Sequence, residues 1–243
     1  MKNAVLIIKG LCLSLLLAGG WANQVLAKTP QLQACVAQIA GLSFNNGGAD
    51  GILIEIVKRL DDFYDGEINI NSYPFARSIY AATQGKCDFH VPFIQSPSSE
   101  LNFNSKPLTR VAFVIYRKAL LPGITSASTE IGPIDTIRGH GRFFNFDTVE
   151  VNTEIQGLKR VLKSRSNAFI YAQEPVDSTI AREKLHGLFS KELLGYFPSG
   201  IVLPDDEEHA NRIDKILTPL LLEAEKHPDY RLMLSKMHSD FTL

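Results

Sequence analysis

The sequence predicts an α/β protein made of two similar halves, each a mostly parallel sheet flanked by helices. Helical and strand periodicities alternate along the first half, which is the pattern of a sheet with helices on its faces. Residues 76–93 and 158–171 each show a helix, a turn and a strand, entered by Cys87-Asp88-Phe89 and by Asn167-Ala168-Phe169. This internal echo indicates two similar lobes, although any α/β protein can offer such a pair by chance.

The elements of the first half follow from local signals. Asp50 can cap a helix whose apolar side chains recur every three or four residues, and Gly66 ends that element. The residue before Pro74 avoids helical backbone, so a loop is expected there. Valine, isoleucine and aromatic residues mark the last strand of this half. In order, we expect strand 32–39, helix 50–60, strand 67–71, loop 73–75, helix 76–84, strand 88–93 and strand 110–116.

Alternation resumes after a loop over residues 120–129. We expect strand 148–151, helix 154–163, strand 168–171 and then a helical tail. An apolar stripe from Ile213 to Leu221 defines the first tail helix, and Tyr230 to Met237 defines the second. Pro219 should kink or break the first of these helices, because proline lacks the N–H that a helix interior uses.

Residues 1–27 are expected to be a signal peptide, which would place the mature protein in the periplasm. Lys2 and Lys9 are followed by an apolar run at residues 11–18 and by Val25-Leu26-Ala27, the small-residue pattern that signal peptidase reads. The apolar run is shorter than the roughly 20 residues that cross a bilayer. A retained membrane anchor is the alternative interpretation. Cys12 lies too early for a lipoprotein.

Charge and size narrow the class of protein. The chain has 25 basic and 26 acidic residues, a net charge of −1 that becomes −3 without the two lysines of the leader. No basic footprint for nucleic acid or for a membrane surface is present, so neither partner is expected after processing. The 216 residues beyond the leader suffice for one large domain or two small lobes. We expect a monomer.

Cys35 and Cys87 are the cysteines that remain after cleavage. In an oxidising compartment two cysteines have one possible pairing. Two buried, unpaired thiols that pack as small apolar side chains are the alternative.

Motifs for catalysis, cofactors or metals are missing. The sequence has no Gly-x-Ser-x-Gly, no phosphate loop and no His-Glu-x-x-His. Gly139-His140-Gly141 is half of a dinucleotide fingerprint without its preceding strand, and we interpret it as a flexible turn. The histidines lack metal-ligand spacing, and the acidic run 205–208 before His209 is interpreted as a helix start. We therefore expect no cofactor, no metal and no enzymatic activity.

Residues 73–118 resemble the type 2 periplasmic binding proteins, specifically bacterial extracellular solute-binding family 3. Those proteins share a helix ending in Gly-Lys-x-Asp, a Thr/Ser-Pro turn, an Asp-Phe-Ser-x-Pro-Tyr segment and a strand ending in Arg-Lys. The counterparts here are Gln84-Gly85-Lys86-Cys87-Asp88, Ser96-Pro97, residues 102–108 and Val111 to Lys118. The helix from Gly51 to Leu60 also resembles the first helix of the family.

The resemblance implies two α/β lobes joined by two hinge crossings near Lys118 and Leu203, with a small-molecule ligand between the lobes. Lobe 1 would comprise residues 28–117 and 205–243, and lobe 2 residues 118–204. The first and third strands of the family lie side by side, which would bring Cys35 and Cys87 within bridging distance of each other. The implied partner is an ABC permease or a membrane sensor.

Two departures from the family concern the ligand. Amino-acid binders of the family have an arginine after the Ser-Pro turn that grips the α-carboxylate, whereas this turn continues Ser98-Ser99-Glu100. They also have an aspartate for the α-ammonium at the end of a strand in the second lobe, where this chain has Ala172. We therefore expect a ligand other than a standard α-amino acid.

Ligands of open α/β sheets bind beyond the carboxyl ends of the strands, and a pocket for a small ligand combines an apolar wall with a few polar groups. Arg77 is the best charged candidate, because a guanidinium in the first turn of a helix needs a bound anion or a neighbouring acid. A surface ion pair is the alternative for Arg77, and core packing is the alternative for Phe75 and Phe93. The candidate ligand-binding residues are Phe44, Asn45, Tyr73, Phe75, Arg77, Phe93, Gln95, Gln173 and Glu174. They suggest a partly apolar solute with at most one anionic group, stacked on an aromatic ring and contacted by Arg77.

The leading hypothesis is a binding protein that delivers a solute to an ABC permease or reports it to a membrane sensor. A periplasmic enzyme of the dehydratase type on the same scaffold is one alternative, with Glu174 as the one plausible general acid or base. A degenerate member that binds only a protein partner is the other alternative. An apolar, closed cleft without polar groups would favour that last possibility.

The leader generates the first prediction. Protein recovered from the periplasm should begin at Lys28, because cleavage follows the small residue Ala27. N-terminal sequencing checks this, and an intact leader or an acyl group on Cys12 would contradict it.

Overall fold

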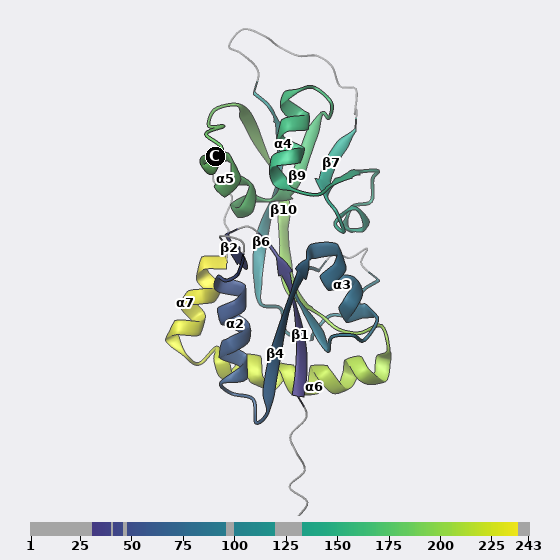
Figure 1. Ribbon diagram of the computed structural model, residues 1–243, viewed down its shortest axis with the longest axis vertical. Coiled ribbons are helices and arrows are strands. Elements are labelled where there is room, and N and C mark those ends of the chain that lie inside the picture. Colours follow the sequence, from purple (N-terminus) through teal and green to yellow (C-terminus); the bar gives the residue numbers. More distant parts are fainter. Residues whose placement is uncertain (1–30, 40, 46–47, 96–99, 120–132, 238–243) are drawn as a thin grey trace, which may run out of the picture. The chain divides into compact units, whose positions relative to one another are not determined.

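The computed structural model describes residues 31–39, 41–45, 48–95, 100–119 and 133–237 (Figure 1). The expected signal peptide and Cys12 lie outside the described residues. So do the Ser96-Pro97 turn and the loop expected over residues 120–129.

The described chain forms one mixed sheet of eight strands in the order β4-β1-β5-β10-β6-β9-β7-β8, together with a short hairpin of β2 and β3. The strands are β1 (Gln31–Gln38), β2 (Phe44–Asn45), β3 (Gly48–Ala49), β4 (Glu67–Pro74), β5 (Phe89–Ile94), β6 (Thr109–Lys118), β7 (Ile134–Ile137), β8 (Val149–Val151), β9 (Ala168–Ala172) and β10 (Phe189–Val202). The helices are α2 (Ile52–Asp61), α3 (Phe75–Thr83), α4 (Glu154–Leu162), α5 (Gln173–Arg182), α6 (Glu207–Ala224) and α7 (Pro228–Met237), with a 3-10 turn η2 (Gly141–Phe143).

Two parallel groups of strands are joined by an antiparallel pair. β1 pairs in parallel with β4 and β5, and β7 pairs in parallel with β8 and β9. Between these groups β10 runs antiparallel to both β5 and β6, and β6 runs antiparallel to β9. β6 and β10 therefore carry the chain between the two halves (Figure 1). This confirms the predicted two-lobed mixed α/β architecture.

Each half has its own hydrophobic core. The first core joins β1 and β5 to α2, α6 and α7, and it includes Leu53, Phe89 and Ile213. The second joins β6 and β9 to α4, and it includes Phe113 and Leu158. Burial of a side chain of this size contributes about 1.5–3 kcal/mol to stability, so each core stabilises its own half.

One crossing strand changes cores along its length. On β10, Phe197 packs against the second core, whereas Ile201 packs into the first. On β6, Phe113, Val114 and Tyr116 pack into the second core, and Leu108, just before the strand, packs into the first. The change of core therefore lies within β10 and at the start of β6.

Several expected elements need correction. β10 and α5 were not predicted, because Gly195 and Pro198 interrupt the strand pattern of β10 and α5 has little apolar periodicity. Residues 73–74 continue β4 instead of forming a loop, and α3 begins at Phe75. The N-cap of α2 is Gly51, which makes no side-chain capping bond, and not Asp50.

Pro219 does not break the first tail helix, which continues as α6 from Glu207 to Ala224. Leu217 and Leu221 are buried on either side of the proline. This packing offsets the cost of a proline in a helix interior, about 3 kcal/mol. The start of α6 is as predicted, because the Asp206 side chain caps the helix by accepting a hydrogen bond from the His209 N–H at 2.8 Å.

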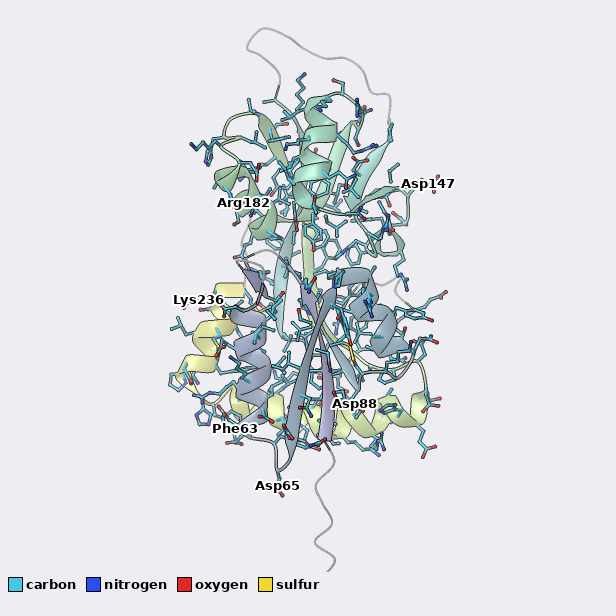
Figure 2. All side chains as sticks on the ribbon, in the orientation of Figure 1. Phe63, Asp65, Asp88, Asp147, Arg182 and Lys236 are labelled. Atoms are coloured by element: carbon cyan, nitrogen blue, oxygen red, sulfur yellow. A yellow bond between two sulfur atoms is a disulfide. The ribbon has the colours of Figure 1, made fainter. Side chains whose placement is uncertain are left out.

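Cys35 and Cys87 form a disulfide, as the resemblance implied. Their Cα atoms lie 5.8 Å apart, within the range that a bridge requires. Cys35 lies on β1, and Cys87 lies just before the neighbouring β5. The bridge is buried against Ala81 and Ala82 of α3 (Figure 2).

The disulfide generates the second prediction. Replacing both cysteines by alanine should lower the free energy of unfolding by about 4 kcal/mol, because the bridge closes a loop of 52 residues in the unfolded chain. Urea unfolding measures this, and reduced wild-type protein is the matched control. An unchanged unfolding midpoint would show that the bridge adds no stability.

Candidate functional site

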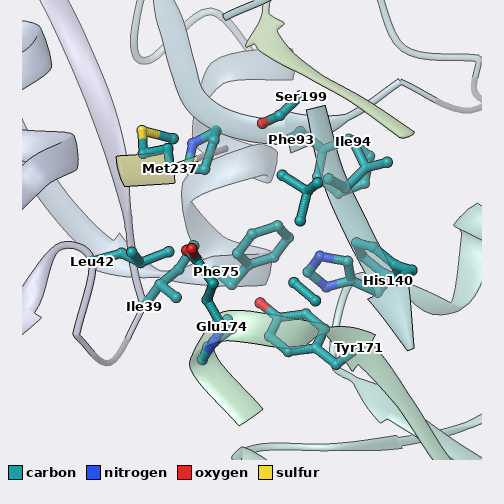
Figure 3. Close-up of a pocket in the computed structure, with 15 residues that line it drawn as sticks. Ile39, Leu42, Phe75, Phe93, Ile94, His140, Tyr171, Glu174, Ser199 and Met237 are labelled. Atoms are coloured by element: carbon teal, nitrogen blue, oxygen red, sulfur yellow. The ribbon is translucent and has the colours of Figure 1, made fainter. Parts of the chain in front are cut away.

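A small cavity lies where the two cores approach each other (Figure 3). About 50 Å³ of it is open to the centres of water-sized molecules. One water needs about 10–15 Å³ by this measure, so the cavity holds a few waters and is smaller than the roughly 150 Å³ that admits a benzene ring. Its lining consists of Ile39, Leu42, Phe75, Pro92, Phe93, Ile94, Val111, Phe113, His140, Tyr171, Ala172, Glu174, Pro175, Ser199 and Met237.

The lining residues follow the carboxyl ends of parallel strands in both halves. Ile39 follows β1, and Phe75 follows β4 directly. In the second half His140 follows β7, and Glu174 follows β9. Because the carboxyl ends of parallel strands lie at one edge of their sheet, both halves present their loops to the same space.

An aromatic cluster closes one side of the cavity. The His140 ring lies 4.1 Å from the Phe75 ring, 4.9 Å from Tyr171 and 5.5 Å from Phe93, measured between ring centroids. Phe75 and Phe93 belong to the first core, so His140 reaches across from the second half to contact them.

Gly139 allows His140 to reach that position. Its φ of +94° is a backbone conformation that other residues rarely adopt, and an added Cβ would lie 3.3 Å from the Ala76 backbone. The loop therefore passes close to the start of α3. The interpretation of Gly139-His140-Gly141 as a turn was incomplete, because the turn inserts a side chain into the aromatic cluster.

Two histidines near the cavity are buried and neutral. His90 on β5 is fully buried, and its ring nitrogens lie 2.7 Å from the Ser78 hydroxyl and 2.9 Å from the Pro92 carbonyl. Burial lowers the pKa of His90 to about 3. Burial, with a smaller contribution from nearby His90, also lowers the pKa of His140 to about 3. Among the described residues, the Nδ1 atom of His140 has no hydrogen-bond partner.

Among the described lining residues, Glu174 is the one with a carboxylate. It is half-buried in the first turn of α5, and burial raises its pKa above the usual value. In the described part of the chain no hydrogen bond or ion pair reaches this carboxylate. Figure 3 shows the Glu174 side chain extending toward the Phe75 ring, beside Tyr171. Among the described residues that line the cavity there is no lysine or arginine.

Three of the predicted ligand-binding residues line this cavity: Phe75, Phe93 and Glu174. Gln173 is buried beside it, but its amide nitrogen donates to an Asp177 carboxylate oxygen at 3.0 Å. Gln95 packs over Gly200, where an added Cβ would lie 2.6 Å from the Gln95 amide nitrogen.

The remaining candidates lie elsewhere. Tyr73 packs against the disulfide, and the exposed Arg77 places its guanidinium 5.0 Å from the centre of the Tyr73 ring. The backbone of Phe44 and Asn45 forms β2, and the prediction for these two residues stays a prediction. Arg77 is therefore paired with a neighbouring aromatic ring in this structure, and not with a group in the cavity.

Sequence reasoning missed most of the remaining lining residues, notably His140, Tyr171, Phe113 and Met237. His140 carries a weak signal, because glycines flank it on both sides after a strand. Met237 comes from α7, at the far end of the chain, and nothing local indicates its position.

The same described ranges contain neither a cluster of metal-ligating side chains nor a helix that could cross a membrane. No group of three or more histidine, cysteine or acidic side chains there is arranged to hold a metal ion. None of the described helices is both long and apolar enough to cross a membrane.

No protein-family model matches the sequence, and no curated protein matches it. Solved structures match its fold. A histidine kinase sensor domain with similarity to periplasmic binding proteins has a TM-score of 0.68 at 13% identity, covering 86% of this chain and 96% of that one. A mutant of ArgBP from T. maritima has a TM-score of 0.65 at 14% identity, covering 85% and 94%. An ancestral amino acid-binding protein, a precursor of cyclohexadienyl dehydratase, has a TM-score of 0.63 at 15% identity, covering 86% and 96%.

These likenesses show that the chain has the two-lobed type 2 periplasmic binding protein fold, as the resemblance implied. At this level of identity they establish the fold alone. What the site does must be argued from its own side chains.

The buried histidines generate the third prediction. His90 and His140 have pKa values of about 3 when folded, against about 6.5 when unfolded, so stability is lost as the pH falls below 6.5. Each histidine contributes up to about 1.4 kcal/mol per pH unit to this loss. His140→Phe should therefore make the free energy of unfolding fall less steeply between pH 6.5 and pH 4.

Urea unfolding at a series of pH values measures that slope. Phenylalanine keeps an aromatic ring in the cluster, and the same substitution at the exposed His186 is the matched control. An unchanged slope in His140→Phe would mean that His140 takes up no proton on unfolding.

Proposed function

We propose that this chain is a periplasmic solute-binding protein that captures a small molecule between its lobes and does no chemistry on it. The observation that carries the proposal is the cavity at the carboxyl ends of both groups of parallel strands. Ligands of open α/β sheets bind at this position, and the lining combines apolar walls with a few polar groups.

The composition of the lining supports a ligand other than a standard α-amino acid. An α-carboxylate in the cavity would find no lysine or arginine among the lining residues, and it would share the space with Glu174. Burying a charge without a partner costs several kcal/mol. The absence of an arginine after the Ser96-Pro97 turn points the same way.

Capture requires the lobes to move relative to each other, and two strands connect them. β6 and β10 pair along their length, from Lys118 opposite Phe189 to Thr109 opposite Ser199, and the side chains of β10 pack against both cores. We propose that the lobes rotate as rigid bodies about these strands. The bound form would then be delivered to an ABC permease or read by a membrane sensor. Solved structures of similar fold include the substrate-binding protein of an amino acid ABC transporter and a histidine kinase sensor domain.

A second candidate is a protein that keeps the fold and binds only a protein partner. The nearly apolar lining and the small volume of the cavity favour it. An enzyme of the dehydratase type would have to use Glu174 as its acid or base. Turnover of a bound ligand that Glu174→Gln abolishes would establish that alternative.

The fourth prediction tests capture in the cavity. In a thermal-shift screen against small metabolites, a ligand at 100 times its dissociation constant should stabilise the protein by about 2.7 kcal/mol. Ala172→Leu should abolish this stabilisation, because Ala172 lines the cavity and the three added carbon atoms would fill it. Ala181→Leu is the matched control, since Ala181 is exposed on α5, the helix that follows Ala172.

Stabilisation that survives Ala172→Leu would place the ligand elsewhere. A screen without any stabilising compound would favour the protein-binding candidate.

A further inference from the structure

The unpaired carboxylate of Glu174 calls for an explanation beyond its place in the fold. An acid in the first turn of a helix interacts favourably with the helix dipole, which accounts for a carboxylate at the start of α5. It does not account for the apolar surroundings. The carboxylate is half-buried beside Phe75 and Leu42, its pKa is raised by burial alone, and no described cation or hydrogen-bond donor reaches it.

His140 provides a second, independent observation at the same cavity. It is 2% exposed, and its Nδ1 atom has no hydrogen-bond partner of normal geometry among the described residues, although the Ile137 backbone lies near enough to the ring to raise its pKa slightly against the effect of burial. Buried polar atoms are almost always hydrogen-bonded, so an unpaired one beside a cavity points to a group that fills the cavity. A neutral imidazole offers one acceptor nitrogen, and the Tyr171 hydroxyl beside it can accept a further hydrogen bond.

The aromatic walls favour the same kind of ligand. The faces of phenylalanine and tyrosine rings attract cations, and this attraction grows when water is excluded. Phe75, Phe93, Phe113 and Tyr171 all line the cavity, and the described lining adds one carboxylate and no lysine or arginine. An anion would meet Glu174 without any compensating charge, and a neutral solute would leave Glu174 unpaired.

We infer that the cavity takes a small organic ammonium ion, an amine with an apolar or aromatic body and no carboxylate. Its charge lies against Glu174, an N–H group faces His140, and its body lies among the aromatic rings. The inference rests on the proposed function, because it names the class of solute that the interlobe cavity captures. The cavity as it stands is smaller than the roughly 150 Å³ that admits a benzene ring, so a solute with one ring enters by the lobe movement proposed above.

Four probes that share one benzene ring test the fifth prediction: benzylamine, benzyl alcohol, benzoate and phenylglycine. Isothermal titration calorimetry of the whole exported protein at neutral pH should show benzylamine binding at least about tenfold more tightly than benzyl alcohol. Benzoate should not bind at the same concentrations. Phenylglycine is benzylamine with an added carboxylate, and it should not bind either.

A matched pair of variants locates the preference. Glu174→Gln keeps the shape of the side chain and removes its charge, so benzylamine and benzyl alcohol should then bind within about twofold of each other. Glu183→Gln removes an exposed carboxylate just after α5, and it should keep the tenfold preference. Circular dichroism and thermal melting confirm that both variants are folded.

The possible failures are separable. If benzyl alcohol or benzoate binds as tightly as benzylamine, or if Glu174→Gln keeps the preference for the amine, the inference is overturned and capture in the cavity stands. If none of the four probes binds but a metabolite stabilises the protein in a manner sensitive to Ala172→Leu, the inference again fails alone. If no compound of any class binds, the proposed function fails with it.

Discussion

The antiparallel pairing of β6 with β10 is the constraint on which the rest of the structure depends. It runs from Lys118 opposite Phe189 to Thr109 opposite Ser199. On its other edge β10 pairs with β5 of the first parallel group, and β6 pairs with β9 of the second. Because this one pair joins both groups, the carboxyl ends of their strands face a common space. The loops that follow those strands contribute residues to the cavity lining. The site is a consequence of the topology before any particular side chain is considered.

Burial around that space sets the protonation state of the ionisable groups near it. Burial keeps His90 and His140 neutral by lowering their pKa values, and it raises the pKa of Glu174. The same low-dielectric surroundings strengthen any charge pair that forms inside, since a Coulomb interaction grows as the effective dielectric constant falls. The cavity is unfavourable for an isolated charge, but a ligand charge opposite in sign to that of Glu174 would form such a pair. We therefore propose that the Glu174 carboxylate and the four aromatic rings favour a cation.

Much of the fold could be predicted from local periodicity, whereas much of the site could not. The buried face of α2 and the apolar strand β5 follow from spacing alone. β10 could not be found in this way, because its outer half is partly exposed on both faces and contains Gly195 and Pro198. In the site, Phe75 was predicted from its place after a strand. Arg77 was predicted from the same loop after the strand, but it lies two residues beyond Phe75 on α3. That spacing places it about 200° around the helix, where it points to solvent. His140 required knowledge of a contact between the two halves, which no local pattern contains.

The solved structures of similar fold bear on where a ligand binds, but not on which ligand binds. At 13–15% identity the shared feature is the arrangement of strands and helices, which apolar patterning maintains through many substitutions. The position of the cavity comes with that arrangement. Its charge does not, because Glu174 belongs to the sequence of this chain and not to the arrangement of strands. The proposal that the ligand lacks a carboxylate therefore comes from the lining residues. The side chains must therefore take precedence over the fold in naming what is bound.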